Sequence, residues 1–157
     1  MSEVLGTPTL IKGGLAVDDR GVLRFVNDFN PQDAGVKRFY QVQNHASGFI
    51  RAWHGHTKGS KFVYCVQGSA IVLATQLPAI GIPGEDIDAK YVSRTMLSST
   101  CPSMLVIPPN YYNGFKTLGE NTILVFFTTT TMEEDKTDDF RLDWDRFGKK
   151  IWEVKYR

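Results

Sequence analysis

The sequence contains few cysteines and no long apolar run, and each scarcity excludes a class of protein. Cys65 and Cys101 are the only cysteines among 157 residues, and they form no Cys-x-x-Cys motif. A disulfide framework or a thiolate metal site is therefore not expected. The few cysteines and the absence of a recognisable signal peptide predict a cytoplasmic protein. No apolar run approaches the roughly 20 residues that a membrane helix needs, so no membrane contact is predicted.

Neither sign of charge is in excess. The chain has 18 lysines and arginines against 17 aspartates and glutamates, which gives a formal net charge of +1. This balance does not favour a nucleic-acid partner, although a binder of small anions needs only a local basic cluster. Hydrophobic residues make up 42% and charged residues 22%, which is typical of a globular chain. The length suits a single domain over residues 1–157.

Short apolar runs rich in Val, Ile, Phe, Tyr and Thr predict an all-β fold. These runs occupy residues 21–29, 36–43, 61–67, 69–76, 104–109 and 121–131. Turn-forming residues separate them, as at 18–21 and 118–121, which is typical of a sandwich or barrel of short strands. Residues 77–91 are interpreted as a surface insertion between strands. The best helical candidate, residues 131–147, has too weak a periodicity for a core helix.

Two of the three histidines, His54 and His56, lie one residue apart. Residues i and i+2 of a strand point to the same face, so both imidazoles are expected on one side of a sheet. The surrounding spacing is Gly48, five residues, His54-x-His56, four residues, Lys61, six residues and Gly68. It resembles the first motif of the cupin superfamily. The stretch VIPPNYYNGF, with Pro108, Asn110 and Asn113, resembles the second motif but lacks its glycine and its histidine.

The residues at the cupin ligand positions disfavour a metal. Lys61 stands where the motif has a glutamate, and its cation repels a divalent ion. Asn113 stands at the position of the fourth ligand and is a poor ligand for a transition metal. We therefore predict no metal and no cofactor. Two buried histidines with a purely structural role remain the alternative.

Nearly the whole chain resembles the dTDP-4-dehydrorhamnose 3,5-epimerases and the related sugar 3,4-ketoisomerases. Four stretches carry this resemblance: DDRGVLRFV (18–26), KRFYQVQNHASGFIRAWHGH (37–56), GSKFVYCVQGSAIVLA (59–74) and MLVIPPNYYNGFKTL (104–118). The resemblance implies a cupin β-barrel of jelly-roll topology and a nucleotide-sugar substrate. It also implies a homodimer in which an amino-terminal strand, residues 7–12, is added to the partner's sheet.

The resemblance also implies roles for single residues. His54 stands at the position of the general base and Lys61 at that of the lysine that stabilises the enolate. Arg20 and Arg51 stand where arginines hold the diphosphate and the sugar, and the dimer would bring Arg20 near the neighbouring site. His56 matches only the ketoisomerases, which have His-x-His. Further candidates for substrate binding are Tyr40, Gln43, Asn44, Tyr111 and Asn113.

The chemistry of a 4-keto sugar supports these roles independently. The C4 carbonyl acidifies the hydrogens at C3 and C5, and a neutral imidazole with a pKa near 6.5 can remove one of them. The enolate that forms needs a fixed positive charge, and a diphosphate needs arginine forks. Aromatic side chains for the nucleotide base are available in Tyr40, Trp53, Tyr111 and Phe115, although plain packing is an equal interpretation.

Two departures from the epimerases concern the acid and base groups. Residues 69–76 contain no acid to pair with the histidine, and residues 128–132, TTTTM, lack the expected tyrosine. Tyr40, Tyr64, Tyr111 and Tyr112 are the candidates for a second proton-transfer group. Epimerisation at C3 and/or C5 is the favoured prediction. A 3,4-ketoisomerase and a non-catalytic cupin that binds sugar nucleotides are the alternatives, and the implied context is the biosynthesis of a polysaccharide or a glycosylated natural product.

Overall fold

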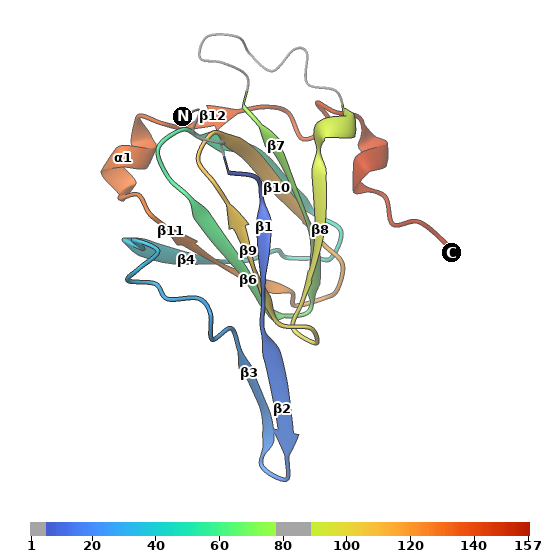
Figure 1. The fold of residues 1–157 in the computed structure, drawn as a ribbon. Coiled ribbons are helices and arrows are strands. Elements are labelled where there is room, and N and C mark those ends of the chain that lie inside the picture. Colours follow the sequence, from blue (N-terminus) through green and yellow to red (C-terminus); the bar gives the residue numbers. More distant parts are fainter. Residues whose placement is uncertain (1–5, 78–88) are drawn as a thin grey trace.

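A computed structural model describes residues 6–77 and 89–157, and the expected insertion at 77–91 lies mostly outside these ranges. The described residues form twelve strands and three short helices (Figure 1). The strands are β1 (Thr9–Lys12), β2 (Gly14–Asp18), β3 (Gly21–Phe25), β4 (Arg38–Gln43), β5 (Ile50–His56), β6 (Lys61–Gln67), β7 (Ser69–Gln76), β8 (Ser93–Ser98), β9 (Ser103–Ile107), β10 (Tyr111–Thr117), β11 (Ile123–Thr128) and β12 (Phe140–Arg141). The helices are η1 (Ala89–Tyr91), α1 (Met132–Lys136) and η2 (Lys149–Trp152).

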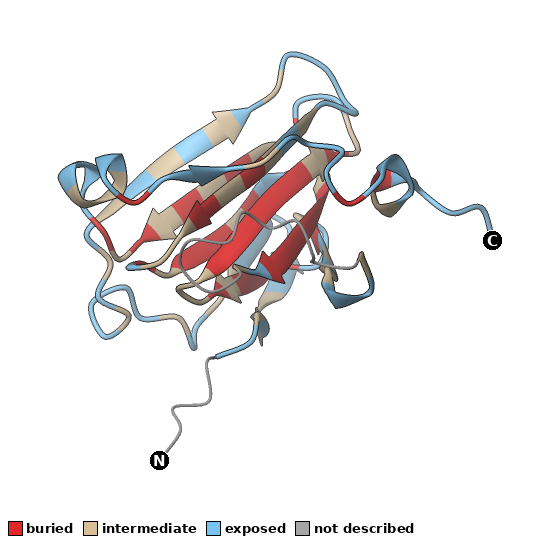
Figure 2. Ribbon diagram, turned by 90° about the horizontal axis from the view of Figure 1, so that it is seen from above, coloured by how far each residue is buried: buried red, intermediate tan, exposed pale blue. Residues whose placement is uncertain are grey.

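Ten of the described strands form two antiparallel sheets that pack face to face. Sheet I has the order β1-β9-β6-β11-β4, and sheet II has the order β12-β5-β10-β7-β8. The core lies between them and is red in the view from above (Figure 2). Its buried apolar residues come from both sheets and include Val63, Leu105 and Phe126 from sheet I and Val72, Leu97 and Phe115 from sheet II. The predicted all-β cupin barrel is confirmed.

Alternation of buried and exposed residues explains why these segments form strands. Tyr40 and Val42 of β4 pack against the core, whereas the residues between them face outward. In β11, Leu124 and Phe126 are buried in the same way. This period of two places one row of side chains in the core and the other row outside. Each of the six predicted runs coincides with a strand, although β9 begins one residue before its run.

A second hydrophobic cluster covers the outer face of sheet II. Trp53 of β5 is fully buried there against Phe147 and Trp152, with ring centroids 5.1 and 5.4 Å away. The carboxy-terminal segment therefore acts as a cover for this sheet. Trp53, which the sequence offered as a partner for a nucleotide base, faces this cluster instead. The weak helical candidate at 131–147 supplies only the short helix α1 before it continues into β12 and this cover.

Strands β2 and β3 form a separate hairpin that projects from the body of the molecule (Figure 1). Strand β1, which precedes the hairpin, pairs with β9 of the same chain from Thr9 to Lys12. Strand β1 is the edge strand of sheet I, so β9 occupies one of its edges, and the addition of residues 7–12 to a partner's sheet stays a prediction. Among the described residues, no helix is long and apolar enough to cross a membrane.

Candidate active site

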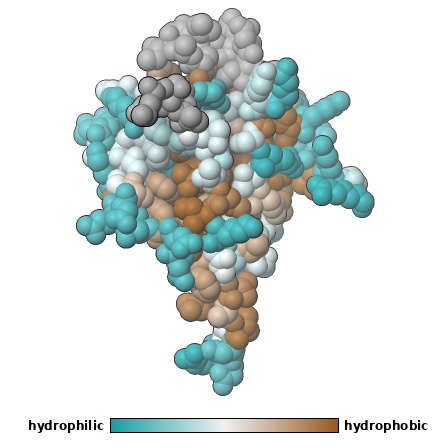
Figure 3. Space-filling model, viewed as in Figure 1, coloured by the Kyte–Doolittle hydropathy of each residue, from teal (hydrophilic) through white to brown (hydrophobic). Residues whose placement is uncertain are grey.

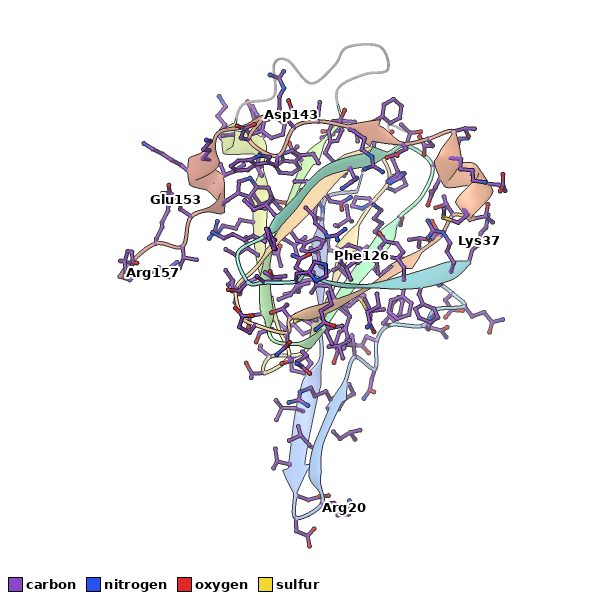
Figure 4. The ribbon with its side chains drawn as sticks, turned by 180° about the vertical axis from the view of Figure 1, so that it is seen from behind. Arg20, Lys37, Phe126, Asp143, Glu153 and Arg157 are labelled. Atoms are coloured by element: carbon purple, nitrogen blue, oxygen red, sulfur yellow. The ribbon has the colours of Figure 1, made fainter. Side chains whose placement is uncertain are left out.

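A cavity of about 490 Å³ opens between the two sheets, near the carboxyl end of β5. Sheet I contributes β4, β6 and β11 to its walls, sheet II contributes β5, β10 and β12, and α1 lies at its rim. The lining residues are Arg38, Tyr40, Val42, Arg51, His54, His56, Lys61, Asn113, Phe115, Phe126, Met132, Asp135, Lys136, Asp139 and Arg141. Figure 4 labels one of these lining residues, Phe126, in the middle of the barrel. Basic and aromatic groups dominate the lining, which suits an anionic ligand that carries rings.

Strand β5 presents His54, His56 and Arg51 to the cavity. The two histidines are two residues apart and share a face, as predicted. Arg51 is three residues from His54 and would face the other side of a regular strand. The pairing of β5 with β10 shifts by one residue, however, because Asn113 lies opposite His54 and Phe115 lies opposite Arg51. This β-bulge brings Arg51 to the cavity side.

Gly114 allows β10 to approach the bulge closely. A Cβ atom at this position would lie 2.3 Å from the Cβ of Ala52 and 3.0 Å from its Cα. The side chain of the preceding residue, Asn113, is buried. Its Nδ2 donates a hydrogen bond to the carbonyl oxygen of His54 at 3.1 Å. Asn113 therefore fixes the backbone at the histidine.

Lys61 projects from β6 of sheet I and is almost completely buried, with 8% of its surface exposed. Burial lowers the pKa of its ammonium group to about 8, and the carboxylates of Asp135 and Asp139 oppose this effect. The group is therefore charged at neutral pH. A buried cation held in this way can stabilise a negative oxygen on a bound substrate.

Both histidines are neutral at physiological pH. Burial, together with the positive charges of Arg141 and Lys61, lowers the pKa of His54 to about 4. Burial and Lys61 also lower the pKa of His56, and Asp135 opposes them. Each imidazole therefore has a free nitrogen that can accept a proton from a substrate.

Tyr40 forms the aromatic part of the opposite wall. Its ring stacks on Phe126 with a centroid distance of 5.1 Å and an interplanar angle of 3°, and the guanidinium of Arg38 lies 5.4 Å from its centroid. Burial raises the pKa of the Tyr40 hydroxyl to about 12, despite the nearby charge of Arg38. The hydroxyl therefore stays protonated at neutral pH and can donate a hydrogen bond or a proton.

The carboxylates of the cavity come from the segment after β11, which sequence reasoning missed. Asp135 of α1 forms an ion pair with Arg38 and lies 3.8 Å from His56 Nδ1. Asp139 forms an ion pair with Arg141 at 2.9 Å, and β12 places Arg141 opposite His54 in register. The available signal was the acidic run at 133–139, although nothing in the sequence showed that it folds back over the histidines.

The structure brings six of the ten predicted site residues together. His54, His56, Lys61, Arg51, Tyr40 and Asn113 line the cavity. Asn44 does not line it, but its Oδ1 accepts a hydrogen bond from Arg51 Nε at 2.9 Å. It therefore supports the cavity from outside.

The other three predicted residues do not line the cavity of this chain. Gln43 follows the alternation of β4 and faces outward, since Tyr40 and Val42 occupy the inner positions. Tyr111 packs into the core between the sheets. Arg20 lies at the tip of the projecting hairpin, far from Phe126 in Figure 4, and pairs with Asp18 at 2.5 Å.

A metal site would need a cluster of ligands, and the described residues contain no group of three or more His, Cys, Asp or Glu side chains that could hold an ion. Lys61 also places a positive charge beside both histidines. The absence of a metal stays a prediction.

The fold and the cavity define a cupin of the kind that sugar-nucleotide epimerases and isomerases use. Residues 8–152 match the family described as FdtA: WxcM-like, C-terminal, and the chain belongs to this family. The spore coat polysaccharide biosynthesis protein SpsL of Bacillus subtilis (strain 168) is 28% identical over 131 residues, which cover 82% of each chain.

Two solved structures illustrate the similarity of fold. The dTDP-4-dehydrorhamnose 3,5-epimerase of Bacillus anthracis, solved with TDP and PPi bound, has a TM-score of 0.70 and 19% identity over 88% of this chain and 79% of that chain. The second is a histidine-to-asparagine mutant of the 3,4-ketoisomerase QdtA from Thermoanaerobacterium thermosaccharolyticum, in complex with TDP-4-keto-6-deoxyglucose. It has a TM-score of 0.66 and 19% identity over 88% of this chain and 90% of that chain.

Proposed function

We propose that the protein is a sugar-nucleotide isomerase that moves the ketone of a 4-keto-6-deoxy sugar from C4 to C3. The observation that carries this proposal is the placement of two neutral imidazoles, His54 and His56, side by side on one wall of the cavity. A ketone shift between adjacent carbons needs proton transfer at C3 and at C4. Two neighbouring bases on one side of the sugar can perform both transfers.

The steps follow from these groups. One imidazole removes the proton from C3, and the electron pair of that bond forms a C3–C4 double bond while the C4 oxygen becomes an oxyanion. Lys61 stabilises this charge, and proton exchange between the C3 and C4 oxygens converts one enediolate into the other. An imidazolium then delivers a proton to C4 as the C3 carbonyl forms. The proton count balances, and no oxidant or reductant is needed.

The rim of the cavity further favours this reaction over epimerisation. The stretch 128–132 resembles the part of the epimerases that carries their tyrosine, and here it ends at Met132, which lines the cavity without an ionisable group. Inverting a carbon needs a second group on the opposite face of the sugar. The sequence favoured epimerisation, whereas this geometry favours the ketone shift.

Epimerisation at C3 and/or C5 is the second candidate, and one observation supports it. Tyr40 lies on sheet I, across the cavity from His54 on sheet II, and keeps its proton at neutral pH. It therefore offers an acid to the face opposite the histidines. Tyr64, Tyr111 and Tyr112 are not among the residues that line the cavity.

The substrate we propose carries a nucleoside diphosphate, with dTDP as the first choice. Arg38, Arg51, Lys136 and Arg141 supply positive charge around the cavity, and Tyr40 and Phe115 supply aromatic faces. Arginine forks match the oxygens of a diphosphate. The two solved relatives were crystallised with TDP or a TDP-sugar, which supports the same choice. A cytoplasmic role in polysaccharide biosynthesis fits such a substrate and the name of the relative SpsL.

A homodimer is part of the proposal because the projecting hairpin is apolar on both faces. Val17 and Leu23, which belong to opposite faces of the two strands, are 68% and 66% exposed. Brown apolar surface is visible along the hairpin in Figure 3. An isolated two-stranded hairpin is marginally stable in water, so this surface needs a cover, and a second copy of the chain would supply it. The tip residue Arg20 would then reach the partner's cavity.

The proposal is tested by turnover of dTDP-4-keto-6-deoxyglucose with the variants His54→Asn and His56→Asn. Each should lose about 100-fold or more in kcat, because general acid–base groups contribute roughly 10²–10⁴-fold. Both should still bind dTDP, as measured by calorimetry. Wild-type protein that binds dTDP but shows no turnover would support the non-catalytic alternative.

Mixing subunits tests the dimer. If Arg20 serves the partner's cavity, Arg20→Ala and His54→Asn proteins are each inactive, and a refolded equal mixture regains about a quarter of the wild-type activity. A mixture that stays inactive would contradict the shared site.

A further inference from the structure

One ring nitrogen of His56, Nδ1, is buried and has no role in the proton transfers described above. This nitrogen is inaccessible to solvent and makes no hydrogen bond in the described part of the chain. The Oδ1 atom of Asp135 lies 3.8 Å away, just beyond hydrogen-bond distance. A buried polar nitrogen without a partner is costly, so a short approach of the carboxylate is favourable.

Asp135 is held in place from several directions. The hydroxyl of Thr130 donates to Oδ1 at 2.6 Å, and the guanidinium of Arg38 pairs with Oδ2. Helix α1, which carries Asp135, begins with a capping box in which Thr131 and Glu134 bond to each other's backbone amides. The carboxylate is thus fixed by β4, by the loop after β11 and by the helix cap.

We propose that Asp135 is the positioning carboxylate of His56: it accepts the Nδ1 proton and thereby leaves Nε2 as the nitrogen that exchanges protons with the sugar. This inference rests on the proposed isomerase function. It gives the two histidines different environments. The acid nearest to His54 is Asp139, which is already bound by Arg141 at 2.9 Å.

The charges around His56 come from every neighbouring element. Lys61 of β6 faces it with a positive charge, and Arg38 of β4 and Arg141 of β12 also line the cavity. The negative charges are the carboxylates of Asp135 in α1 and of Asp138 and Asp139 in the segment that follows, and a hydrogen bond with the backbone of Asp138 also raises the pKa of His56. His54 is the remaining titratable neighbour on β5. Burial and Lys61 lower the pKa of His56, and Asp135 is the first of the groups that raise it. Loss of this carboxylate should therefore make protonation of His56 harder.

The test compares Asp135→Asn with the matched control Glu133→Gln. Glu133 lies on the same helix, but it is exposed and its partner is Lys136. Two-bond proton–nitrogen spectra of the histidine rings give the tautomer and the pKa of each histidine in the free protein. Turnover with dTDP-4-keto-6-deoxyglucose gives kcat and KM as functions of pH. Asp135→Glu serves as the conservative variant.

The wild-type protein should show the proton of neutral His56 on Nδ1. Asp135→Asn should lower the pKa of His56 by about one unit, because an opposite charge at this range shifts a pKa by roughly 1–3 units. Its kcat should fall about 10- to 100-fold with little change in KM, as for other residues that orient a reacting group. Asp135→Glu should recover part of kcat, and Glu133→Gln should match the wild type.

A wild-type His56 with its proton on Nε2 would overturn the inference, and this measurement needs no variant to fold. An unchanged His56 pKa or an unchanged kcat in Asp135→Asn would overturn it as well. Failure of the proposed function is distinguishable, because the spectra need no substrate. If the wild-type protein shows no turnover but neutral His56 carries its proton on Nδ1, the proposed isomerase is contradicted. The contact between His56 and Asp135 is then still supported.

Discussion

Replacing Lys61 with methionine should stabilise the fold while it removes catalysis. The ammonium group is buried, and burial lowers its pKa from 10.5 to about 8. Each unit of pKa difference corresponds to about 1.4 kcal/mol, so the charged form costs the folded state about 3 kcal/mol at neutral pH. Methionine has a similar shape and no charge, and it should return most of this free energy.

The dependence on pH gives the prediction its sign. The lysine pKa is lower in the folded than in the unfolded state, so the unfolded chain binds more protons between pH 8 and 10.5. Wild-type stability should therefore rise with pH across this window. The advantage of Lys61→Met should be full below about pH 8 and should shrink as the wild-type lysine loses its charge.

The assay is thermal unfolding at pH 7 and pH 9.5, with turnover measured in parallel. A gain of about 3 kcal/mol corresponds to roughly 6–12 °C in Tm for a chain of this size. At pH 9.5 less than half of that gain should remain. Lys58→Met, at an exposed position in the loop before β6, is the control and should leave Tm and turnover unchanged. A Lys61→Met protein that is no more stable than the wild type at pH 7 would refute the reasoning.

Three further predictions follow from the described contacts. The plot of kcat/KM against pH should have a plateau between about pH 4, where His54 gains a proton, and about pH 8, where Lys61 loses its charge. Asp138→Asn should lower stability at pH 7 by about 2 kcal/mol in urea unfolding, because its buried carboxylate accepts hydrogen bonds from the loop after β5. Gly114→Ala should cost about 1–3 kcal/mol, because its Cβ would overlap Ala52.

Each of these three predictions has a contradicting outcome or a control variant. An acid limb near pH 6.5 would contradict a buried, uncharged His54. Burial raises the pKa of Asp138, but hydrogen bonds from Thr57 and Lys58 outweigh it and hold the pKa below its ordinary value. The Asp138→Asn deficit should therefore disappear as pH falls through that lowered pKa, and a deficit that persists would point to packing alone. Gly119→Ala, where the new Cβ meets Thr122 Oγ1 at an ordinary 3.6 Å, should be tolerated.

The parts of the molecule that sequence could predict depend on local periodicity. The alternation in β4 and β11 and the spacing of His54 and His56 both follow from the strand period of two, and both are confirmed. The same rule fails at Arg51. A β-bulge in the pairing with β10 turns the Arg51 side chain to the cavity side. Local pattern cannot show a shift in register between strands.

Contacts between distant segments were equally hidden. The resemblance placed an acid in the strand at 69–76, whereas the cavity takes its carboxylates from Asp135 and Asp139, which lie 74 and 78 residues after Lys61. Tyr111 was a plausible site residue by composition, and only the packing of the two sheets shows that it belongs to the core. Arg20 stays a candidate solely through a second subunit.

The most direct test of the proposed isomerase is proton NMR of the protein with dTDP-4-keto-6-deoxyglucose in deuterated water. A ketone shift from C4 to C3 removes the hydrogen from C3 and creates a new C–H bond at C4. The proposal therefore predicts a 3-keto product with deuterium at C4 and an undisturbed hydrogen at C5. A ketone that stays at C4 while deuterium enters C3 or C5 would contradict the ketone shift and support epimerase chemistry instead.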